Sequence, residues 1–187
     1  DAGLTDKVLP LFAETYQRRV AKLGPDHPDT LVSLNNLAGG YFVAGQIDKS
    51  VELFEESLTK KKRRFGSDHP DTIGAMQNLA RIYQVAKRPE KSEPLLAEAL
   101  ETLSKLVEPE HPQRLLAIDE LIMLYLRGPN SAKAIPRLME QVDLRRKTLA
   151  PGSLELYSLL ANSSYLLLHA KGEAEAEDIL REALELG

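Results

Sequence analysis

The sequence predicts an all-α fold, a solenoid of about nine helices that stack in consecutive pairs. Three observations lead to this prediction: a motif recurs at a fixed interval, apolar residues fall at helical spacing between its copies, and Pro or Gly residues stand where each helix should begin or end. The motif is a His-Pro pair, and its copies begin at His27, His69 and His111, 42 residues apart each time. A fixed interval of this length is typical of a repeat array, in which each copy contacts mainly its neighbours.

The first predicted helix is the second half of an incomplete repeat. Residues 5–22 place Leu11 and Phe12 in register with Leu53 and Phe54 of the following copy. Because this helix lacks the partner that would precede it, we expect some of its apolar side chains to be exposed and the ends of the array to be open to self-association.

The next copy shows how each repeat divides into two helices. Pro28 suits the first position of a helix, since its missing N–H costs nothing there, and Asp29 complements the positive end of the helix dipole. Gly45 can adopt the left-handed conformation that ends a helix, and Asp48 can cap the helix that follows. Between these markers the apolar residues recur at helical spacing. They are Leu34, Leu37, Ala38, Tyr41, Ala44, Val51, Leu53, Phe54 and Leu58.

The same division holds for the later copies, although the last copy is degenerate. Ser153-Leu154 stands there in place of the His-Pro pair, as is expected at the end of an array. We therefore interpret residues 1–187 as one array rather than as separate domains. Its parts are a truncated repeat over 1–22, full repeats over 23–64, 65–106 and 107–148, and a degenerate terminal repeat over 149–187.

Two phrases recur in these copies and point to a known family. The first full repeat contains Leu31-x-x-Leu34-Asn35-Asn36-Leu37-Ala38-x-x-Tyr41 and Asp26-His27-Pro28-Asp29-Thr30. With these phrases and the 42-residue period, the chain resembles the tetratricopeptide repeat (TPR) family, in particular its kinesin light-chain variety. The resemblance implies a right-handed superhelix in which the first helix of each repeat, helix A, lines a concave groove beside the second, helix B. It also implies binding of other proteins rather than catalysis.

The third and fourth copies depart from the family's motif at four positions that are small or aromatic in the earlier copies. Larger side chains replace small ones at two of these positions, and this makes close packing of the helices there an open question. The four residues are Ile122, Gln141, Ser164 and Leu167.

The composition argues against several classes of function. With no Cys, the chain has no disulfide, thiolate zinc site or cysteine nucleophile. A net charge of −4 argues against a dedicated nucleic-acid binder. No apolar run approaches the roughly 20 residues that span a membrane, and residues 1–6 do not resemble a signal peptide, so we expect a cytoplasmic protein. Since no nucleophile with a base, phosphate loop or ligand cluster stands out, we expect no catalytic residue, cofactor or metal.

Two polar features admit a functional interpretation beside a structural one. The repeated His could ligate a metal, but helices pack about 8–10 Å apart whereas zinc holds each His nitrogen at about 2.0–2.1 Å, so we favour a device that starts each helix. For the same lack of partners, His169 is expected to be structural. The basic run Lys60-Lys61-Lys62-Arg63-Arg64 could contact nucleic acid. Its place at the end of a helix B, where cations complement the dipole, favours a structural role.

The candidate binding surface is the face of helix A that packing does not use. An amide recurs on it at one position of three copies, Asn36, Asn78 and Asn162, with Glu120 in the remaining copy. A primary amide both donates and accepts hydrogen bonds, so this column could hold the backbone of an extended peptide; alternatively, the amides satisfy local backbone groups or face water. The predicted groove residues are Asn35, Asn36, Gly39, Phe42, Gln77, Asn78, Arg81, Gln84, Asp119, Glu120, Met123, Asn162 and Tyr165.

The charges on this surface also leave two interpretations open. Arg81 precedes Asp119 and Glu120 of the next copy. Such a set suits a peptide of mixed charge, and an ion pair between Arg81 and Glu120 within the protein accounts for it equally well.

Two predicted helices, 112–127 and 154–170, are apolar nearly all round, which favours either an apolar groove or cover by another chain.

We therefore expect a non-enzymatic module that binds an extended peptide or short helix of a partner protein. The alternative is a scaffold or spacer segment of a larger signalling protein, for example one with a kinase or nucleotide-binding domain.

Overall fold

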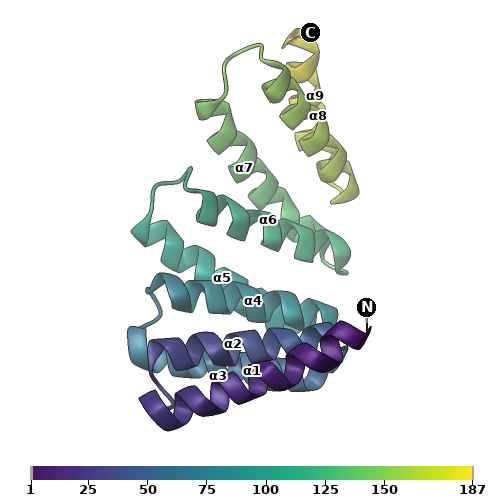
Figure 1. The fold of residues 1–187 in the computed structure, drawn as a ribbon. Helices are drawn as coiled ribbons and strands as arrows, with labels where there is room; N and C mark the ends of the chain where they lie inside the picture. Colours follow the sequence, from purple (N-terminus) through teal and green to yellow (C-terminus); the bar gives the residue numbers. More distant parts are fainter. Residues whose placement is uncertain (1, 187) are drawn as a thin grey trace. The chain divides into compact units, whose positions relative to one another are not determined.

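The computed structural model describes residues 2–186 and the side chains of residues 8–185, and it places this part of the chain in nine α-helices and one short 3₁₀ helix (Figure 1). The described residues form no β-strand. The all-α prediction is therefore confirmed. The elements are α1 (Ala2–Leu23), α2 (Pro28–Val43), α3 (Ile47–Phe65), α4 (Pro70–Val85), α5 (Pro89–Leu106), α6 (Pro112–Arg127), η1 (Ser131–Lys133), α7 (Ala134–Thr148), α8 (Leu154–His169) and α9 (Glu173–Leu186).

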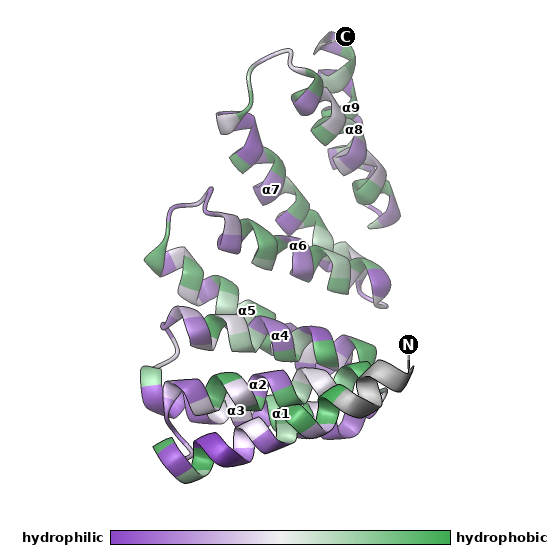
Figure 2. Cartoon of the chain, in the orientation of Figure 1, coloured by the Kyte–Doolittle hydropathy of each residue, from purple (hydrophilic) through white to green (hydrophobic). Residues whose placement is uncertain are grey.

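The helices group into two compact units, Asp1–Thr102 and Leu103–Gly187, and the boundary between them falls within α5. In the first unit α1 packs against α2, α2 against α3 and α3 against α4. In the second unit α6 packs against α7, α7 against α8 and α8 against α9. Apolar and polar residues alternate along these helices, as Figure 2 shows. Each helix therefore has one side to bury and another to expose.

The His-Pro pairs start helices α2, α4 and α6. In each case the His is the N-cap, and its Nδ1 accepts a hydrogen bond from the backbone N–H two residues further on, at 3.2 Å for His27, 3.1 Å for His69 and 3.3 Å for His111. Ser153 does this for α8, where its Oγ accepts from Leu156 N at 3.1 Å. The predicted helix-start role is thereby confirmed, because the bond satisfies an N–H that the helix leaves unpaired.

Within a repeat, helix A and helix B are joined by a contact that no sequence prediction anticipated. A Lys ammonium lies over a Tyr ring at 5.3 Å for Lys49 and Tyr41, at 5.3 Å for Lys91 and Tyr83, and at 5.5 Å for the third pair, Lys133 and Tyr125. Each pair is eight residues apart and recurs at the 42-residue period. Cation–π contacts of this kind contribute about 0.5–1 kcal/mol at exposed sites.

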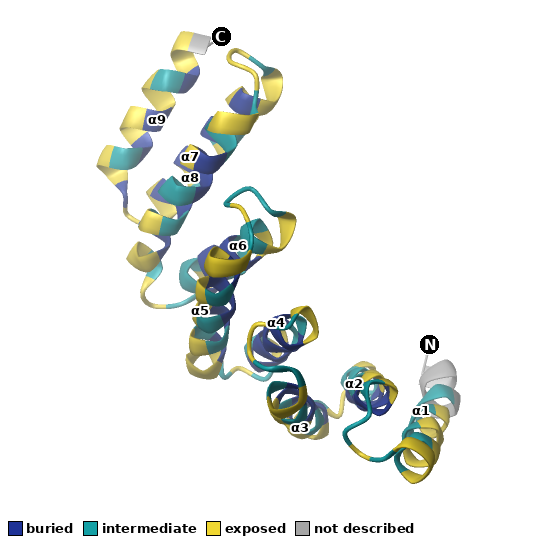
Figure 3. Ribbon diagram, turned by 90° about the vertical axis from the view of Figure 1, so that its left-hand side faces the viewer, coloured by how far each residue is buried: buried dark blue, intermediate teal, exposed yellow. Residues whose placement is uncertain are grey.

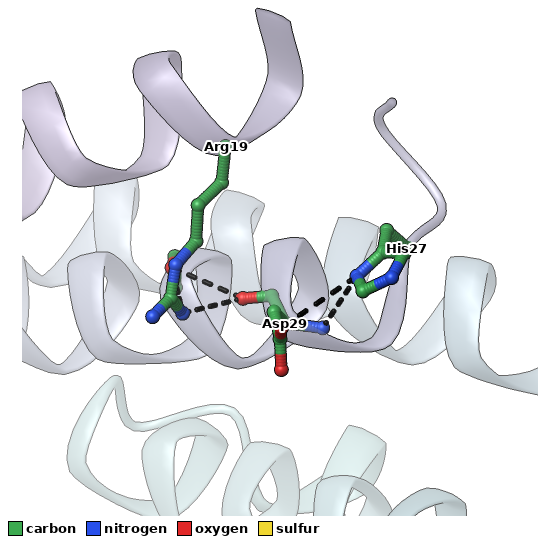
Figure 4. Close-up of polar contacts among 4 residues, drawn as sticks. Arg19, His27 and Asp29 are labelled. Carbon is green, nitrogen blue, oxygen red and sulfur yellow. Dashed lines mark hydrogen bonds and ion pairs between the residues drawn. The ribbon is translucent and has the colours of Figure 1, made fainter. Parts of the chain in front are cut away.

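Successive repeats of the first unit are joined at the end of helix B. Arg19 of α1 donates from Nη1 to the Asp29 carbonyl and to Ser33 Oγ of α2, both at 2.8 Å (Figure 4). One period later, Lys61 of α3 donates from Nζ to the Asp71 carbonyl of α4 at 3.4 Å. A helix-B cation thus holds the first turn of the next helix A.

The four departures from the repeat motif do not disturb the packing of the second unit. Ile122 and Leu167 are buried. Gln141 is also buried, and its Nε2 donates to Asp119 Oδ1, so the polar group has a partner. Ser164 donates from Oγ to the Leu160 carbonyl at 2.8 Å. Each larger or polar residue is therefore either part of the core or hydrogen-bonded inside it.

Candidate functional site

The first unit exposes one stripe along each of its two A helices. The stripe on α2 consists of Val32, Asn36, Gly39 and Val43, and the stripe on α4 consists of the residues one period later, Gly74, Asn78, Arg81 and Val85. Steps of four, three and four residues keep such a set on one side of a helix. Val32, Asn36, Val43, Arg81 and Val85 are exposed, and the other three residues are half-buried. We call these sets the helix-A stripes.

Two glycines leave low points on the stripes. A Cβ atom added at Gly39 or Gly74 would have no heavy atom within 4 Å, whereas a Cβ at the neighbouring Gly40 would lie 2.9 Å from the ring of Phe12. A glycine inside a helix costs about 0.5–1 kcal/mol relative to Ala. Close packing against α1 accounts for that cost at Gly40, but nothing in the described part of the chain accounts for it at Gly39 and Gly74.

Four other predicted groove residues of the first unit lie outside the stripes, and none of them is exposed. Gln77 is 5% exposed, and Asn35, Phe42 and Gln84 are half-buried. Gln84 donates from Nε2 to Ser92 Oγ at 3.4 Å. The buried Oδ1 of Asn35 and Nε2 of Gln77 find no hydrogen-bond partner among the described residues. These four side chains are therefore less accessible to a partner than the exposed residues of the helix-A stripes.

The two amides of the first unit differ in their surroundings. Asn36 is exposed on its stripe. Asn78 accepts a hydrogen bond at Oδ1 from Arg81 Nη2 at 3.0 Å. The side-chain carbonyl of Asn78 is thus held in place. Its NH₂ group is then suited to donate a hydrogen bond to a ligand.

The helix-A stripes of the second unit carry larger side chains. At the matching positions α6 has Leu116, Glu120, Met123 and Arg127, and α8 has Ser158, Asn162, Tyr165 and His169. Tyr165 is 69% exposed and Met123 is 41% exposed. Exposed apolar and aromatic side chains are therefore present on the helix-A stripes of this unit.

A hollow of about 790 Å³ opens between α6, α7 and α8 of the second unit. Asp119 of α6 lies in it, with Oδ2 3.9 Å from Nη2 of Arg145 on α7. Burial raises the pKa of the Asp119 carboxyl, while Arg145 and the Gln141 hydrogen bond act in the opposite direction. The hollow is lined by Leu115, Asp119, Gln141, Arg145, Thr148, Leu149, Leu154, Glu155, Ser158, Leu159, Asn162, Ser163 and Leu166.

Asp119 and Asn162 were both among the predicted groove residues, but the hollow that they line was not predicted. Gln141 and Arg145 of helix B contribute polar groups to the lining of the hollow. Arg145 stands two or three periods after Lys61 and Arg19, which bond to the next helix A. At this junction the cation instead faces the hollow beside Asp119. The one signal in the sequence was Gln141, which replaces a small residue.

The basic run at the end of α3 is occupied by contacts within the protein. Lys60 pairs with Glu56 at 2.6 Å, Lys62 with Glu98 at 2.7 Å and Arg63 with Asp26 at 2.6 Å. Lys61 bonds to a main-chain carbonyl of α4, as described above. These partners support the structural interpretation of the run over a nucleic-acid contact.

Tyr83, Glu55 and Lys91 form a cluster in which Tyr83 is buried, Glu55 is half-buried and Lys91 is exposed. The Tyr83 hydroxyl donates to Glu55 Oε1 at 2.5 Å, and Lys91 Nζ lies 3.7 Å from the same oxygen. Burial and this hydrogen bond raise the pKa of Tyr83 far above its ordinary value. Such a tyrosine stays protonated, so the cluster joins two repeats rather than acting as a base. Within the described residues no group of three or more His, Asp or Glu could hold a metal ion.

The described helices include none that is long and apolar enough to cross a membrane.

Comparisons with known proteins agree with this architecture. The sequence matches the tetratricopeptide repeat family over residues 1–63 and again over residues 32–105. None of the curated proteins matches the chain.

Among solved structures, the chain is similar to the nearly identical TPR-like repeats of a kinesin light-chain protein of Podospora anserina, with a TM-score of 0.82 and 24% identity over 98% of this chain and 87% of that one. It is also similar to BtubC (BKLC) from P. vanneervenii, with a TM-score of 0.75 and 22% identity over 98% of this chain and 73% of that one. These likenesses bear on the fold, which is that of a TPR solenoid, and the family matches together cover more than half of the sequence. The chain belongs to the tetratricopeptide repeat family.

Proposed function

We propose that this chain is a non-enzymatic protein-binding module, and that its helix-A stripes receive an extended peptide or a short helix of a partner protein. TPR repeats in general serve protein–protein interaction. The proposal for this chain rests on three features of the stripes: their amides, their glycines and their exposed apolar side chains.

The strongest support comes from the two glycines of the stripes, Gly39 and Gly74. Gly39 and Gly74 weaken their helices, and no residue that the structure describes packs into the space that they leave. A peptide main chain lying there would approach the helices more closely than any side chain at these positions would allow. Close approach of a ligand backbone is one of the situations in which glycine is the default residue.

The amides beside these low points are suited to hold a main chain. Asn36 lies one turn before Gly39, and Asn78 lies one turn after Gly74. An amide can donate to a peptide carbonyl and accept from a peptide N–H without regard to the peptide's side chains. The Arg81 hydrogen bond supports a donor role for Asn78 in particular.

Selectivity for particular peptides would come from the exposed apolar residues. Val43 is 72% exposed and Val85 is 53% exposed on the first unit, and Met123 and Tyr165 stand out on the second. Large apolar and aromatic residues contribute most of the energy in protein interfaces. In the hollow of the second unit, half-exposed leucines beside Asn162 are suited to take an apolar anchor side chain.

The test is a selection from a random peptide display library on the 187-residue chain, followed by fluorescence anisotropy with the selected peptides. We expect Asn36→Ala with Asn78→Ala to weaken binding at least about tenfold, since each lost hydrogen bond contributes about 0.5–1.5 kcal/mol. Asn130→Ala is the matched control, because Asn130 is an exposed amide in the loop before η1 with no side-chain capping bond. Circular dichroism would verify that all variants are helical.

A second variant, Gly39→Leu, fills a low point without removing any polar group. It should abolish binding of the same peptides while leaving the fold intact. Peptides that bind the asparagine and glycine variants as tightly as the unmodified chain would remove the proposal. A selection that yields no peptide would favour the alternative, a scaffold or spacer segment.

A further inference from the structure

We propose that the hollow between α6, α7 and α8 takes a glutamine side chain of the bound peptide, with Asp119 accepting from its amide NH₂ and Arg145 donating to its amide oxygen. This inference rests on the proposed function, because it names the side chain that such a peptide would place in the hollow. The volume of about 790 Å³ lies within the range of about 300–1,000 Å³ that is typical of ligand pockets. The hollow therefore has room for a side chain and for the main chain beside it.

Asp119 and Arg145 place an acceptor and a donor side by side in the hollow. Asp119 Oδ2 and Arg145 Nη2 are 3.9 Å apart, which is longer than the about 2.7–2.9 Å of a hydrogen bond between such charges. The other carboxylate oxygen of Asp119, Oδ1, accepts from Nε2 of Gln141, a buried residue of α7. This bond fixes the carboxyl group, so Oδ2 and the guanidinium both remain able to bond to a ligand.

Both of these charged residues depart from what their repeat positions do in the first unit. Arg145 is equivalent to Arg19, which donates to a main-chain carbonyl of the next helix A. Asp119 stands where the first unit has the neutral amides Asn35 and Gln77. Two opposite charges therefore meet at this junction, and the cation lies beside the carboxylate instead of joining two helices through a main-chain carbonyl.

Leucines supply the apolar walls of the hollow. Leu115, Leu159 and Leu166 are half-buried lining residues from α6 and α8, and Figure 3 shows that each of these helices has a buried and an exposed side. The two methylene groups of a glutamine can lie against these leucines, and their removal from water is favourable. Asn162, an exposed residue of the lining, is suited to hold the main chain of the same peptide.

The charges of the hollow select against the other kinds of side chain. A lysine or arginine would meet the like charge of Arg145, and a glutamate or aspartate would meet Asp119 and also Glu155, another lining residue. An apolar side chain would remove both Asp119 and Arg145 from water without returning a hydrogen bond. A neutral group that donates and accepts avoids all three costs.

Among the neutral groups, a primary amide fits this acceptor and donor best. Its donor and acceptor are two separate atoms, so each can meet its own partner, whereas a hydroxyl carries both on one atom. Glutamine has one methylene group more than asparagine, which adds to the contact with the leucines. Because burial raises the pKa of the Asp119 carboxyl, an added N–H donor would also restore part of the solvation that this carboxylate loses.

The test uses blocked single amino acids, which contain one side chain between two peptide groups. N-acetyl-glutamine N-methylamide is titrated into the chain with ¹³C-labelled leucine methyl groups, and its Kd is obtained from the shifts of the lining leucines, which single Leu→Met variants assign. We expect the glutamine compound to bind at least about fivefold more tightly than the glutamate, lysine and methionine compounds of the same form. The buried Leu31 and Leu34 of the first unit should not shift.

Two variants examine the acceptor and the donor separately. Asp119→Asn can still accept from Gln141 but turns a donor toward the hollow, so the glutamate compound should now bind more tightly than the glutamine compound. Arg145→Met removes the original donor and should weaken binding of the glutamine compound at least about fivefold. The matched controls are Asp143→Asn and Lys147→Met, which make the same changes of charge at exposed positions of α7 outside the lining. Both should bind like the unmodified chain.

The inference is overturned if the glutamine compound binds no more tightly than the methionine compound, which requires no variant. It is also overturned if Asp119→Asn leaves the preference unchanged although circular dichroism shows a helical chain, or if the controls weaken binding as much as Arg145→Met. These results would not affect the helix-A stripes of the first unit, which Asn36→Ala and Gly39→Leu test. Selected peptides that bind independently of Asn36, together with a confirmed preference for glutamine, would reject only those stripes.

Discussion

Phe12 of α1 lies so close to Gly40 of α2 that a Cβ atom at residue 40 would be 2.9 Å from the ring, with the Leu9 side chain at 3.1 Å. The contact is specific to this junction, because Ile82 and Leu124 occupy the matching position in later repeats and are buried there. The absence of a side chain at Gly40 therefore lets the Phe12 ring approach α2 more closely than any other residue at this position would allow.

The neighbouring glycines should respond oppositely to substitution. Gly40→Val inserts a side chain against Phe12 and should lower the free energy of unfolding by about 1–3 kcal/mol through overpacking. Gly39→Ala meets no other atom and should raise it by about 0.5–1 kcal/mol, since Ala is the better helix former. Urea denaturation followed by circular dichroism measures both, and equal effects of the two changes would contradict the packing described for α1 and α2.

Tyr83 and Tyr41 occupy the same repeat position, but Tyr83 also hydrogen-bonds to Glu55. Removing the two hydroxyls should therefore change the free energy of unfolding unequally. Tyr83→Phe keeps the ring under Lys91 but removes the hydroxyl that donates to the half-exposed Glu55 carboxylate, so we expect the free energy of unfolding to fall by about 0.5–1.5 kcal/mol. Tyr41→Phe is the internal control, because Ala13 stands one period before Glu55 and offers no acceptor. Its free energy of unfolding should change by less than about 0.5 kcal/mol. A similar loss in both variants would show that the Glu55 bond contributes nothing.

The raised pKa of Asp119 should appear in the pH dependence of stability. Because the folded chain binds this proton more tightly than the unfolded chain, the contribution of Asp119 is greatest below its ordinary pKa and is lost as pH rises through the folded value. Asp119→Asn cannot ionise but can still accept from Gln141. The free energy of unfolding of this variant relative to the unmodified chain should therefore increase between about pH 4 and pH 7. Urea titrations at several pH values measure it, and a constant difference would refute the shift.

The repeat boundaries could be predicted because their causes are local. A His N-cap followed by Pro acts within two residues, so it can be recognised without any tertiary contact. The Lys–Tyr pairs are also periodic, but they were missed because an eight-residue separation joins two helices rather than two sides of one helix.

The exposed face of each helix A, on which the proposed binding surface lies, was predicted less completely, because it depends on the rotation of each helix about its axis. Neighbouring residues in a helix differ by about 100°, and so Asn36 is exposed while Asn35 is turned inward. The hollow could not be predicted, because it is formed by three helices from two repeats, and its residues are contiguous only in space. A sequence predicts which residue types are available at such a junction, but not which contact they make. Lys61 bonds to the next helix A, whereas Arg145 faces the hollow beside Asp119.

The Lys–Tyr contacts and the His caps have a kinetic consequence. Each closes only a short loop within one 42-residue copy, so the entropy lost in forming it is small and most early contacts are of low contact order. A copy can therefore gain much of its structure before its neighbours dock, and nucleation is not confined to one region of the chain. Hydrogen exchange should correspondingly detect local opening of individual helices at a lower free energy than global unfolding.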